Sequence, residues 1–247
     1  MTDTRRLRKK TARIIRVLGT FLGTPRRPGR RPPPLDMLIA TILSQNTSDT
    51  NSHRAYAALR SAFPRWSDAA RAPVPAIRKA IRPGGLANKK SLTITSALRA
   101  IMSSGGTPRL AGLRSMSAAE IVNRLTALPG VGVKTASCVL LFSLGRDVCP
   151  VDTHVHRIVR RLGLVPGKGG PDATFRALQP LIPRGRAYAF HTNLIRFGRS
   201  VCRAQAPRCA VCPLFRECTY GPRHRLRRSG SRSPVRRRDF MLLDNVR

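Results

Sequence analysis

The stretch LPGVGVKTA, Leu128–Ala136, limits the possible folds more than any other part of the sequence. Before it, Ser117 and Glu120 have the spacing of a capping box, which predicts a helix that ends at the Pro-Gly pair. After it, an apolar pattern predicts a second helix from about Val133. Two helices joined by a short glycine-containing turn form a helix-hairpin-helix, which we expect near residues 117–145.

Helical patterns also account for most of the remaining chain. No alternating run is long enough to predict a sheet, so we expect an all-α fold. The longest apolar run, MLIATIL at Met37–Leu43, is typical of a buried helix, because a membrane span needs about 20 apolar residues. We therefore expect no membrane association and a cytoplasmic protein.

The charge of the chain is far from balanced. The 247 residues include 47 Lys and Arg against 11 Asp and Glu, a net charge of +36. Residues 1–33 carry 11 basic and 1 acidic side chain, residues 34–218 carry 27 and 8, and residues 219–247 carry 9 and 2. We expect basic arms at both ends, but the body is basic too. Charge spread over a folded body predicts nucleic acid as the partner.

The hairpin turn predicts an anion site. Gly130 and Gly132 permit positive φ and a close backbone approach, so the N–H groups around Val131 can converge on one phosphate. Such a contact positions a duplex without reading its sequence. Many Pro-Gly turns bind nothing, so the turn alone leaves its function open.

Lys134 follows the turn, at the start of the second predicted helix. Neighbouring cations and partial burial both disfavour an ammonium ion, and a neutral amine can attack a carbon atom. A lysine at this place can equally contact a phosphate. The local sequence leaves a nucleophile and an anchoring cation as alternatives.

Asp152 lies one helix and one loop beyond Lys134. It precedes the amphipathic pattern THVHRIVRRLG, which predicts that Asp152 is the N-cap of a helix. The chain is long enough to return, so the carboxylate could face the lysine across a cleft. There it could stabilise positive charge at a sugar C1′ and move protons. A helix cap alone is the simpler interpretation, and one carboxylate can serve both purposes.

Four cysteines near the C-terminal end form a C-x6-C-x2-C-x5-C array, VCRAQAPRCAVCPLFREC. Its members are Cys202, Cys209, Cys212 and Cys218. Such an array in a cytoplasmic chain indicates a metal centre, and both zinc and a [4Fe–4S] cluster accept four thiolates. Arg203 and Arg208 lie between the first two members, so the centre could brace a basic loop against DNA. The other cysteines, Cys138 and Cys149, are predicted to be buried thiols.

Taken together, LPGVGVKTA, VDTHVHRIVRRLG and the cysteine array closely resemble endonuclease III, a DNA glycosylase of the helix-hairpin-helix, Gly/Pro-Asp superfamily. Two further segments resemble the family in the same order. LIATILSQNTSDTN carries Gln45 where the family has an inserted glutamine, and IRPGGLANKK carries Leu86 where the family has an apolar wedge. The resemblance runs from about Asp36 to Tyr220.

The resemblance implies two helical lobes. A six-helix domain would occupy residues 34–150. A cluster domain would combine a helix from residues 1–33 with the C-terminal helices and cysteine loop of residues 151–220. Residues 221–247 lie outside the resemblance, and their own composition predicts a basic, disordered tail. The resemblance also selects [4Fe–4S] over zinc.

The resemblance further implies base flipping in damaged double-stranded DNA by a monomeric protein. Lys134 matches the family's nucleophile, which displaces the base, forms a Schiff base at C1′ and nicks the strand by β-elimination. Asp152 matches the catalytic aspartate. Gln45 and Leu86 would fill the gap and wedge the opposite strand. The implied protein is a bifunctional glycosylase and abasic-site lyase for oxidised pyrimidines in base excision repair.

Two other functions stay open. One is a glycosylase for another damaged or mismatched base, although LSQNTSD lacks the glutamate that adenine glycosylases use as an acid. The other is a non-catalytic DNA-binding protein, although phosphate binding alone needs neither the lysine nor the aspartate. Val133, where the family often has a basic residue, leaves the lesion preference open. We expect a structural imidazole at His191, whereas His154 and His156 could contact phosphate or solvent.

Overall fold

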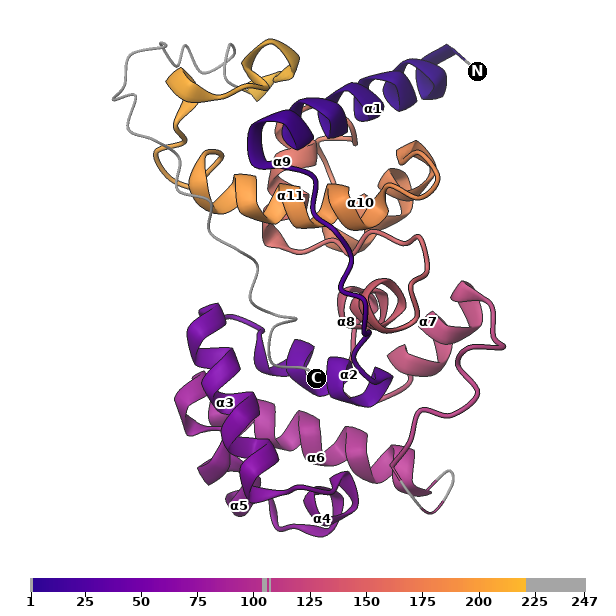
Figure 1. The fold of residues 1–247 in the computed structure, drawn as a ribbon, viewed down its shortest axis with the longest axis vertical. Helices are drawn as coiled ribbons and strands as arrows, with labels where there is room; N and C mark the ends of the chain where they lie inside the picture. Colours follow the sequence, from indigo (N-terminus) through magenta and orange to yellow (C-terminus); the bar gives the residue numbers. More distant parts are fainter. Residues whose placement is uncertain (1, 104–105, 107, 221–247) are drawn as a thin grey trace. The chain divides into compact units, whose positions relative to one another are not determined.

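The computed structural model describes residues 2–103, 106 and 108–220. Over these residues all regular secondary structure is helical and no strand occurs, which confirms the predicted all-α fold (Figure 1). None of the helices in the described ranges is both long enough and apolar enough to cross a membrane. The predicted disordered tail, residues 221–247, lies outside the described residues.

The chain forms two compact units. The first, the hairpin unit, comprises Gly29–Arg146. The second, the cysteine unit, combines, among the described residues, those up to Pro28 with residues 147–220. Lys134, Gln45 and Leu86 belong to the hairpin unit, whereas Asp152 and the four cysteines of the array belong to the cysteine unit.

The hairpin unit is built around a buried central helix. Its elements are α2 (Pro34–Leu43), α3 (Asp49–Ala62), α4 (Trp66–Arg71), α5 (Val74–Ala80), η1 (Arg82–Gly84), α6 (Ala87–Ser103), α7 (Ala118–Thr126), α8 (Val133–Cys138) and the π-helical turn η2 (Val139–Ser143). Helix α2 packs against α3, α6, α8 and η2. Met37, Leu38 and Ile42 on it have no exposed surface. The apolar run therefore forms the predicted buried helix.

The capping box predicted before the hairpin is present. Ser117 Oγ accepts a hydrogen bond from the Glu120 backbone N–H at 3.3 Å, and the Glu120 carboxylate accepts one from the Ser117 N–H at 2.7 Å. These bonds satisfy two donors at the start of α7, which otherwise lack partners within the helix. Ile121 and Leu125 then bury the apolar face of α7.

The second helix of the hairpin begins where expected, but its regular winding ends at Cys138. Beyond it, the Leu144 N–H donates to the carbonyl of Val139, five residues back, which is the π-helical spacing. A π-helical turn therefore continues the second helix as far as Ser143. The turn is completely buried and packs on α2, so tertiary packing sets its backbone more than local propensity does.

The cysteine unit is held together by its first and last long helices. Its elements are α1 (Thr2–Leu22), α9 (Thr153–Arg161), α10 (Pro171–Leu178), η3 (Gln179–Leu181), α11 (Ala187–Ser200), η4 (Cys209–Val211) and η5 (Phe215–Glu217). Helix α1 packs against α11 and buries Ile14 and Leu18 completely. Helix α1, which carries basic residues of segment 1–33, therefore lies with its apolar stripe against the core of this unit.

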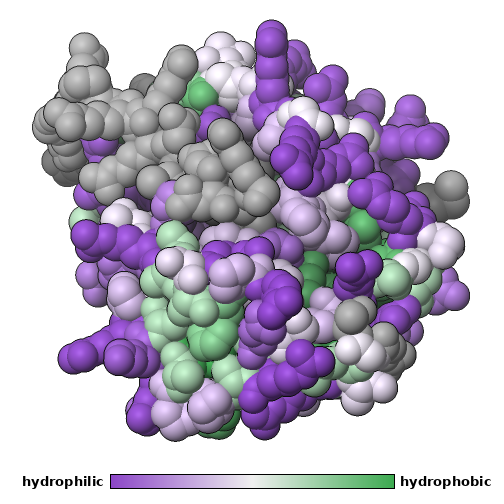
Figure 2. All heavy atoms as spheres, turned by 60° about the horizontal axis from the view of Figure 1, so that its bottom comes forward, coloured by the Kyte–Doolittle hydropathy of each residue, from purple (hydrophilic) through white to green (hydrophobic). Residues whose placement is uncertain are grey.

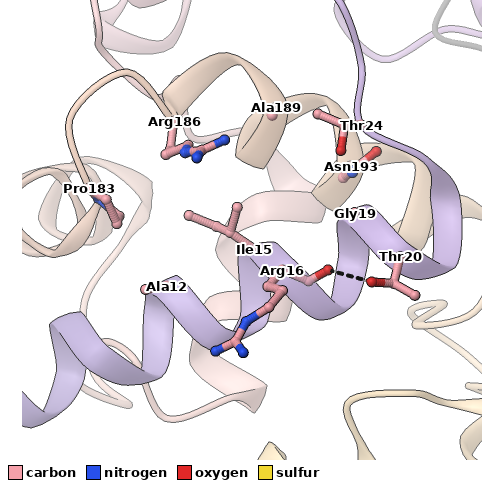
Figure 3. Close-up of a pocket in the computed structure, with 10 residues that line it drawn as sticks. All are labelled: Ala12, Ile15, Arg16, Gly19, Thr20, Thr24, Pro183, Arg186, Ala189 and Asn193. Atoms are coloured by element: carbon pink, nitrogen blue, oxygen red, sulfur yellow. Dashed lines mark hydrogen bonds between the residues drawn. The ribbon is translucent and has the colours of Figure 1, made fainter.

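A groove lies between α1 and α11 (Figure 3). Its volume is about 620 Å³, and the small residues Ala12, Gly19 and Ala189 lie along it. Arg16 and Arg186 bring two cations to its lining. The groove follows from the small side chains, which cannot fill the space between the two helices.

Arginine side chains have a structural use in both units. Acidic side chains are scarce, so most of the arginines cannot form an ion pair with one. Many guanidinium groups instead donate to backbone carbonyls: Arg99 bonds Ala70 and Ala72 at 3.1 and 3.2 Å. These bonds satisfy carbonyls at helix ends. Other cationic side chains remain exposed, and most of the face drawn in Figure 2 is hydrophilic.

Candidate active site

The hairpin turn requires glycine at one of its two glycine positions. Gly130 has φ +73°, and a Cβ added there would lie 2.7 Å from Cγ2 of Thr93. A side chain at this position would therefore be strained and would collide with its neighbour. Gly132 is different, because its φ is −99° and no atom lies within 4 Å of the position of an added Cβ. The backbone at Gly132 therefore faces open space, where a ligand can approach closely.

Val131 anchors the turn between the two glycines. Its side chain is 5% exposed, and its backbone N–H donates to the carbonyl of Leu128 at 3.1 Å. The structure therefore uses both the side chain and the N–H of Val131 inside the turn. The direct DNA contact predicted for this residue stays a prediction, and Gly132 is the more open position.

Lys134 is the second residue of α8 and is half-buried. Within the described part of the chain, its amine has no hydrogen-bond or ion-pair partner. The helix that carries it continues into the buried turn η2, so the base of this side chain is fixed. The arrangement presents an amine without a counterion on a rigid support, which suits a nucleophile.

Gln45 lies in a short loop directly after α2. The next residue, Asn46, has a positive φ of +50°, which is uncommon for a residue with a side chain. Gln45 Nε2 donates to Thr135 Oγ1 at 3.4 Å. The structure therefore brings the predicted inserted glutamine into contact with α8, the helix that also carries Lys134.

Leu86 lies between η1 and α6 and is 53% exposed. Its φ is +51°, and it follows Gly85, whose φ is +65°. A leucine in a left-handed conformation costs about 1–2 kcal/mol, so the surroundings must impose it. An exposed apolar side chain on such a constrained loop has the form expected of a wedge.

Asp152 is the N-cap of α9, as predicted. Its Oδ1 accepts a hydrogen bond from the Val155 N–H at 2.7 Å, and the residue is half-buried. The cap fixes the carboxylate at the start of the helix. Its second oxygen is not part of this cap and is therefore compatible with a chemical role.

Three histidines of the cysteine unit, His154, His156 and His191, have protein partners. His191 is 1% exposed and its Nδ1 lies 3.0 Å from the carbonyl oxygen of Pro150, which confirms the structural interpretation. His156 Nδ1 lies 2.8 Å from Thr174 Oγ1. Burial lowers the pKa of His154, whose Nδ1 lies 3.1 Å from the guanidinium of Arg157. His154 and His156 therefore take part in the packing of their unit.

Two arginines of α9 hold the cysteine loop, a role that sequence reasoning missed. Arg157 donates to the carbonyl of Cys202 at 2.8 Å, and Arg161 donates to the carbonyl of Arg203 at 2.7 Å. The thiol of Cys218 donates to the carbonyl of Arg161 at 3.3 Å. The first and last cysteines of the array are therefore tied to the helix that Asp152 caps.

The four array cysteines are half-buried and form no disulfide within the described residues, and Cys138 and Cys149 are buried, as predicted. Burial, together with weaker electrostatic repulsion from the other three array cysteines, raises the pKa of Cys212 to about 12. Within the described ranges, no three Cys, His, Asp or Glu side chains converge in a ready metal-binding arrangement. The donor set nevertheless fits a group that binds four thiolates, because positive charge would offset their repulsion.

Arg203 and Arg208 lie in the loop between the first two cysteines. Arg203 is exposed, and its carbonyl is the acceptor for Arg161. Arg208 is half-buried, and its backbone N–H donates to the carbonyl of Val201 at 2.9 Å. Arg203 is therefore available to an anionic partner, whereas Arg208 also helps to close the loop.

Comparison with known proteins gives a consistent result. Residues 39–184 match the family model described as the HhH-GPD superfamily of base excision DNA repair proteins. Endonuclease III of Thermotoga maritima is 32% identical over 187 residues, which cover 76% of this chain and 83% of that protein. A putative DNA glycosylase of Arabidopsis thaliana is 40% identical over 165 residues, which cover 67% of this chain but only 56% of that longer protein.

A solved structure is also similar over nearly the whole chain. The structure of a trapped endonuclease III–DNA covalent intermediate, an estranged-adenine complex, matches with a TM-score of 0.74 and 27% sequence identity. The match covers 91% of this chain and all of the other.

Proposed function

Because the chain belongs to the HhH-GPD superfamily of base excision DNA repair proteins and to its endonuclease III family, we propose a bifunctional enzyme. The family makes it a DNA glycosylase of base excision repair. We propose that it excises oxidised pyrimidines from duplex DNA and then cleaves the strand as an abasic-site lyase. The observation that carries this proposal is Lys134, an unpartnered amine within the described residues, at the head of the second hairpin helix.

In the proposed reaction, the neutral amine of Lys134 attacks C1′ of the damaged nucleotide. The C1′–N bond breaks and the base leaves with its bonding electrons, taking up a proton. The C1′–O4′ bond then opens to give the Schiff base. Loss of a proton from C2′ expels the 3′ phosphate by β-elimination, and hydrolysis of the Schiff base frees the lysine. Covalent catalysis thus replaces one difficult step by several easier ones.

Asp152 has two roles in this proposal. Its negative charge stabilises the positive charge that develops at C1′ as the base leaves. It also accepts the proton that the lysine ammonium must lose before or during attack. The cap to Val155 supports these roles because it holds the carboxylate in one position.

DNA binding is proposed to use both units. Gly130 and Gly132 of the hairpin hold a phosphate, and Gln45 and Leu86 enter the duplex where the damaged nucleotide is flipped out. Arg203 and Arg208 contact the phosphate backbone. We propose that the protein acts as a monomer on nucleoid DNA.

The four array cysteines would hold a [4Fe–4S] cluster. When bound, the cluster would supply a structural cross-link that fixes the loop carrying Arg203 and Arg208. The donations from Arg157 and Arg161 to this loop support that interpretation, because they hold the first cysteine in place. Loss of iron and of visible absorbance after Cys212→Ser would test it.

Single-turnover assays on a panel of duplexes would test the substrate proposal. Each duplex carries one lesion: thymine glycol, 8-oxoguanine opposite cytosine, adenine opposite 8-oxoguanine, or thymine opposite guanine. Base release and strand cleavage are measured separately. We expect both on thymine glycol. Base release without cleavage, or a preference for a mismatch, would favour a monofunctional glycosylase, and binding without either reaction would favour a non-catalytic protein.

A further inference from the structure

Lys90 is a buried lysine in the first turn of α6. Its side chain is 3% exposed, and its Nζ donates to the carbonyl of Leu43 at 2.7 Å and to that of Gly84 at 2.9 Å. Burial lowers the pKa of the Lys90 ammonium group. Removing a cationic group from water is unfavourable unless its donors are satisfied. The two carbonyls therefore account for a lysine at a position that an apolar side chain could otherwise fill.

The two carbonyls occupy equivalent places before the two proposed DNA-inserting residues. Leu43 is the last residue of α2, and Gln45 follows it by two positions. Gly84 is the last residue of η1, and Leu86 follows it by two positions. The backbone N–H of Lys90 also donates to the carbonyl of Leu86 at 3.0 Å. One residue therefore holds the bases of both loops.

Both loops have backbones that need such support. Asn46 and Leu86 each have a positive φ, at +50° and +51°, which favours glycine over residues with side chains. Gly84 packs so closely on α3 that an added Cβ would lie 2.9 Å from Cβ of Ala55. Strained conformations of this kind persist where neighbouring contacts determine them. The bonds of Lys90 are contacts that reach both loops at once.

We propose that Lys90 is a positioning residue that fixes the spacing of the Gln45 loop and the Leu86 loop, so that both side chains enter the duplex together. The inference rests on the proposed function, in which Gln45 and Leu86 replace the flipped nucleotide. Lys90 itself touches neither substrate nor reacting atoms. Its removal should therefore impair the reaction where a base must be flipped and should spare the chemistry of Lys134.

Two substrates separate these effects. A duplex with one thymine glycol requires flipping, whereas a single-stranded oligonucleotide with one abasic site does not. Lys90→Met keeps an unbranched side chain that is one atom shorter and removes its donors. Lys79→Met is the matched control, because Lys79 is exposed in α5 of the same unit. We expect Lys90→Met to slow duplex cleavage by about 10- to 100-fold, the scale of small misplacements in catalysis. Cleavage of the single strand should change by less than about twofold, and the control should follow the parent on both substrates.

A double-mutant cycle gives a second readout. In a protein with Gln45→Ala and Leu86→Ala, the further change Lys90→Met should cost less than about twofold on the duplex, because its effect acts through those side chains. If Lys90→Met does not fold, Lys90→Arg serves as the second variant. Arginine keeps hydrogen-bond donors, but its bulkier group would change the spacing of the two loops. It should therefore show the same selective loss of cleavage rate on the duplex. The inference would be overturned if Lys90→Met lowered the cleavage rate equally on both substrates. It would also be overturned if its effect on duplex cleavage were the same with and without the Gln45 and Leu86 side chains. A parent protein that cleaves neither substrate would instead overturn the proposed function, and the role of Lys90 with it.

Discussion

Replacing Gly132 with alanine should weaken DNA binding without destabilising the fold. The residue has φ −99° and open space where the Cβ would stand, so alanine fits without strain. Alanine restricts the conformations of the unfolded chain, which stabilises the folded protein by about 0.4–1 kcal/mol. Alanine is also a poorer N-cap residue than glycine, which destabilises the folded protein by a similar amount. We expect these effects to offset each other and to leave the unfolding free energy within about 0.5 kcal/mol of the parent.

The new methyl group would occupy the space where the phosphate is proposed to lie. Losing a charge-assisted hydrogen bond to that phosphate costs about 1.5–3 kcal/mol, which raises Kd roughly 10- to 150-fold. Fluorescence anisotropy with a duplex containing a tetrahydrofuran abasic analogue measures Kd without cleavage. A Gly132→Ala protein that binds as tightly as the parent would refute the phosphate cradle.

Gly130→Ala is the contrasting variant. A residue with a side chain at this positive φ lowers the unfolding free energy by about 1–2 kcal/mol. The contact of 2.7 Å between the added Cβ and Thr93 lowers it by about 1–3 kcal/mol more, through overpacking. A total of roughly 3 kcal/mol lowers the Tm by about 6–12 °C for a chain of this size. Equal thermal stability of the Gly130→Ala and Gly132→Ala proteins would contradict the geometry of the turn.

Three further predictions concern the cysteine unit and the C-terminal segment. Asp152→Asn should leave the unfolding free energy within about 0.5 kcal/mol of the parent value, because asparagine caps a helix as well as aspartate does. The rate of base release in a single turnover should fall at least about 100-fold. An unchanged rate of base release would exclude a catalytic role for Asp152. Burial lowers the pKa of His154, so as pH falls below about 6.5 the unfolded chain takes up the proton first and stability is lost. Urea unfolding at pH 7 and 5 should show a smaller loss for His154→Gln than for the parent. Deleting residues 221–247, which carry nine Arg and two Asp, should flatten the slope of log affinity against log salt concentration, and an unchanged slope would exclude a DNA contact by that segment.

Helix starts could be predicted from the sequence because their signals are local. The capping box of Ser117 and the cap of Asp152 each use a bond between residues three positions apart. The buried α2 was predictable for a similar reason, since it is a continuous apolar run. For the site, the sequence therefore indicated Lys134 and Asp152 and the elements that carry them.

Features that depend on distant partners could not be predicted in the same way. The π-helical turn after Cys138 follows from packing on α2. The role of Lys90 depends on a carbonyl 47 residues away, and no local pattern distinguishes it from its exposed neighbour Lys89. The composition also suggested that the basic residues bind DNA. In the structure, Arg99 and Arg157 instead donate hydrogen bonds to backbone carbonyls inside their own units.

The central claim is that Lys134 forms a covalent bond with the sugar of a damaged nucleotide. Borohydride trapping tests it most directly, on a duplex with one thymine glycol and on a duplex with one abasic site. We expect a covalent protein–DNA complex with the parent protein and none with Lys134→Ala. An adduct that persists in Lys134→Ala, or its absence from the iron-loaded parent on both duplexes, would contradict the claim and leave Lys134 as a phosphate contact.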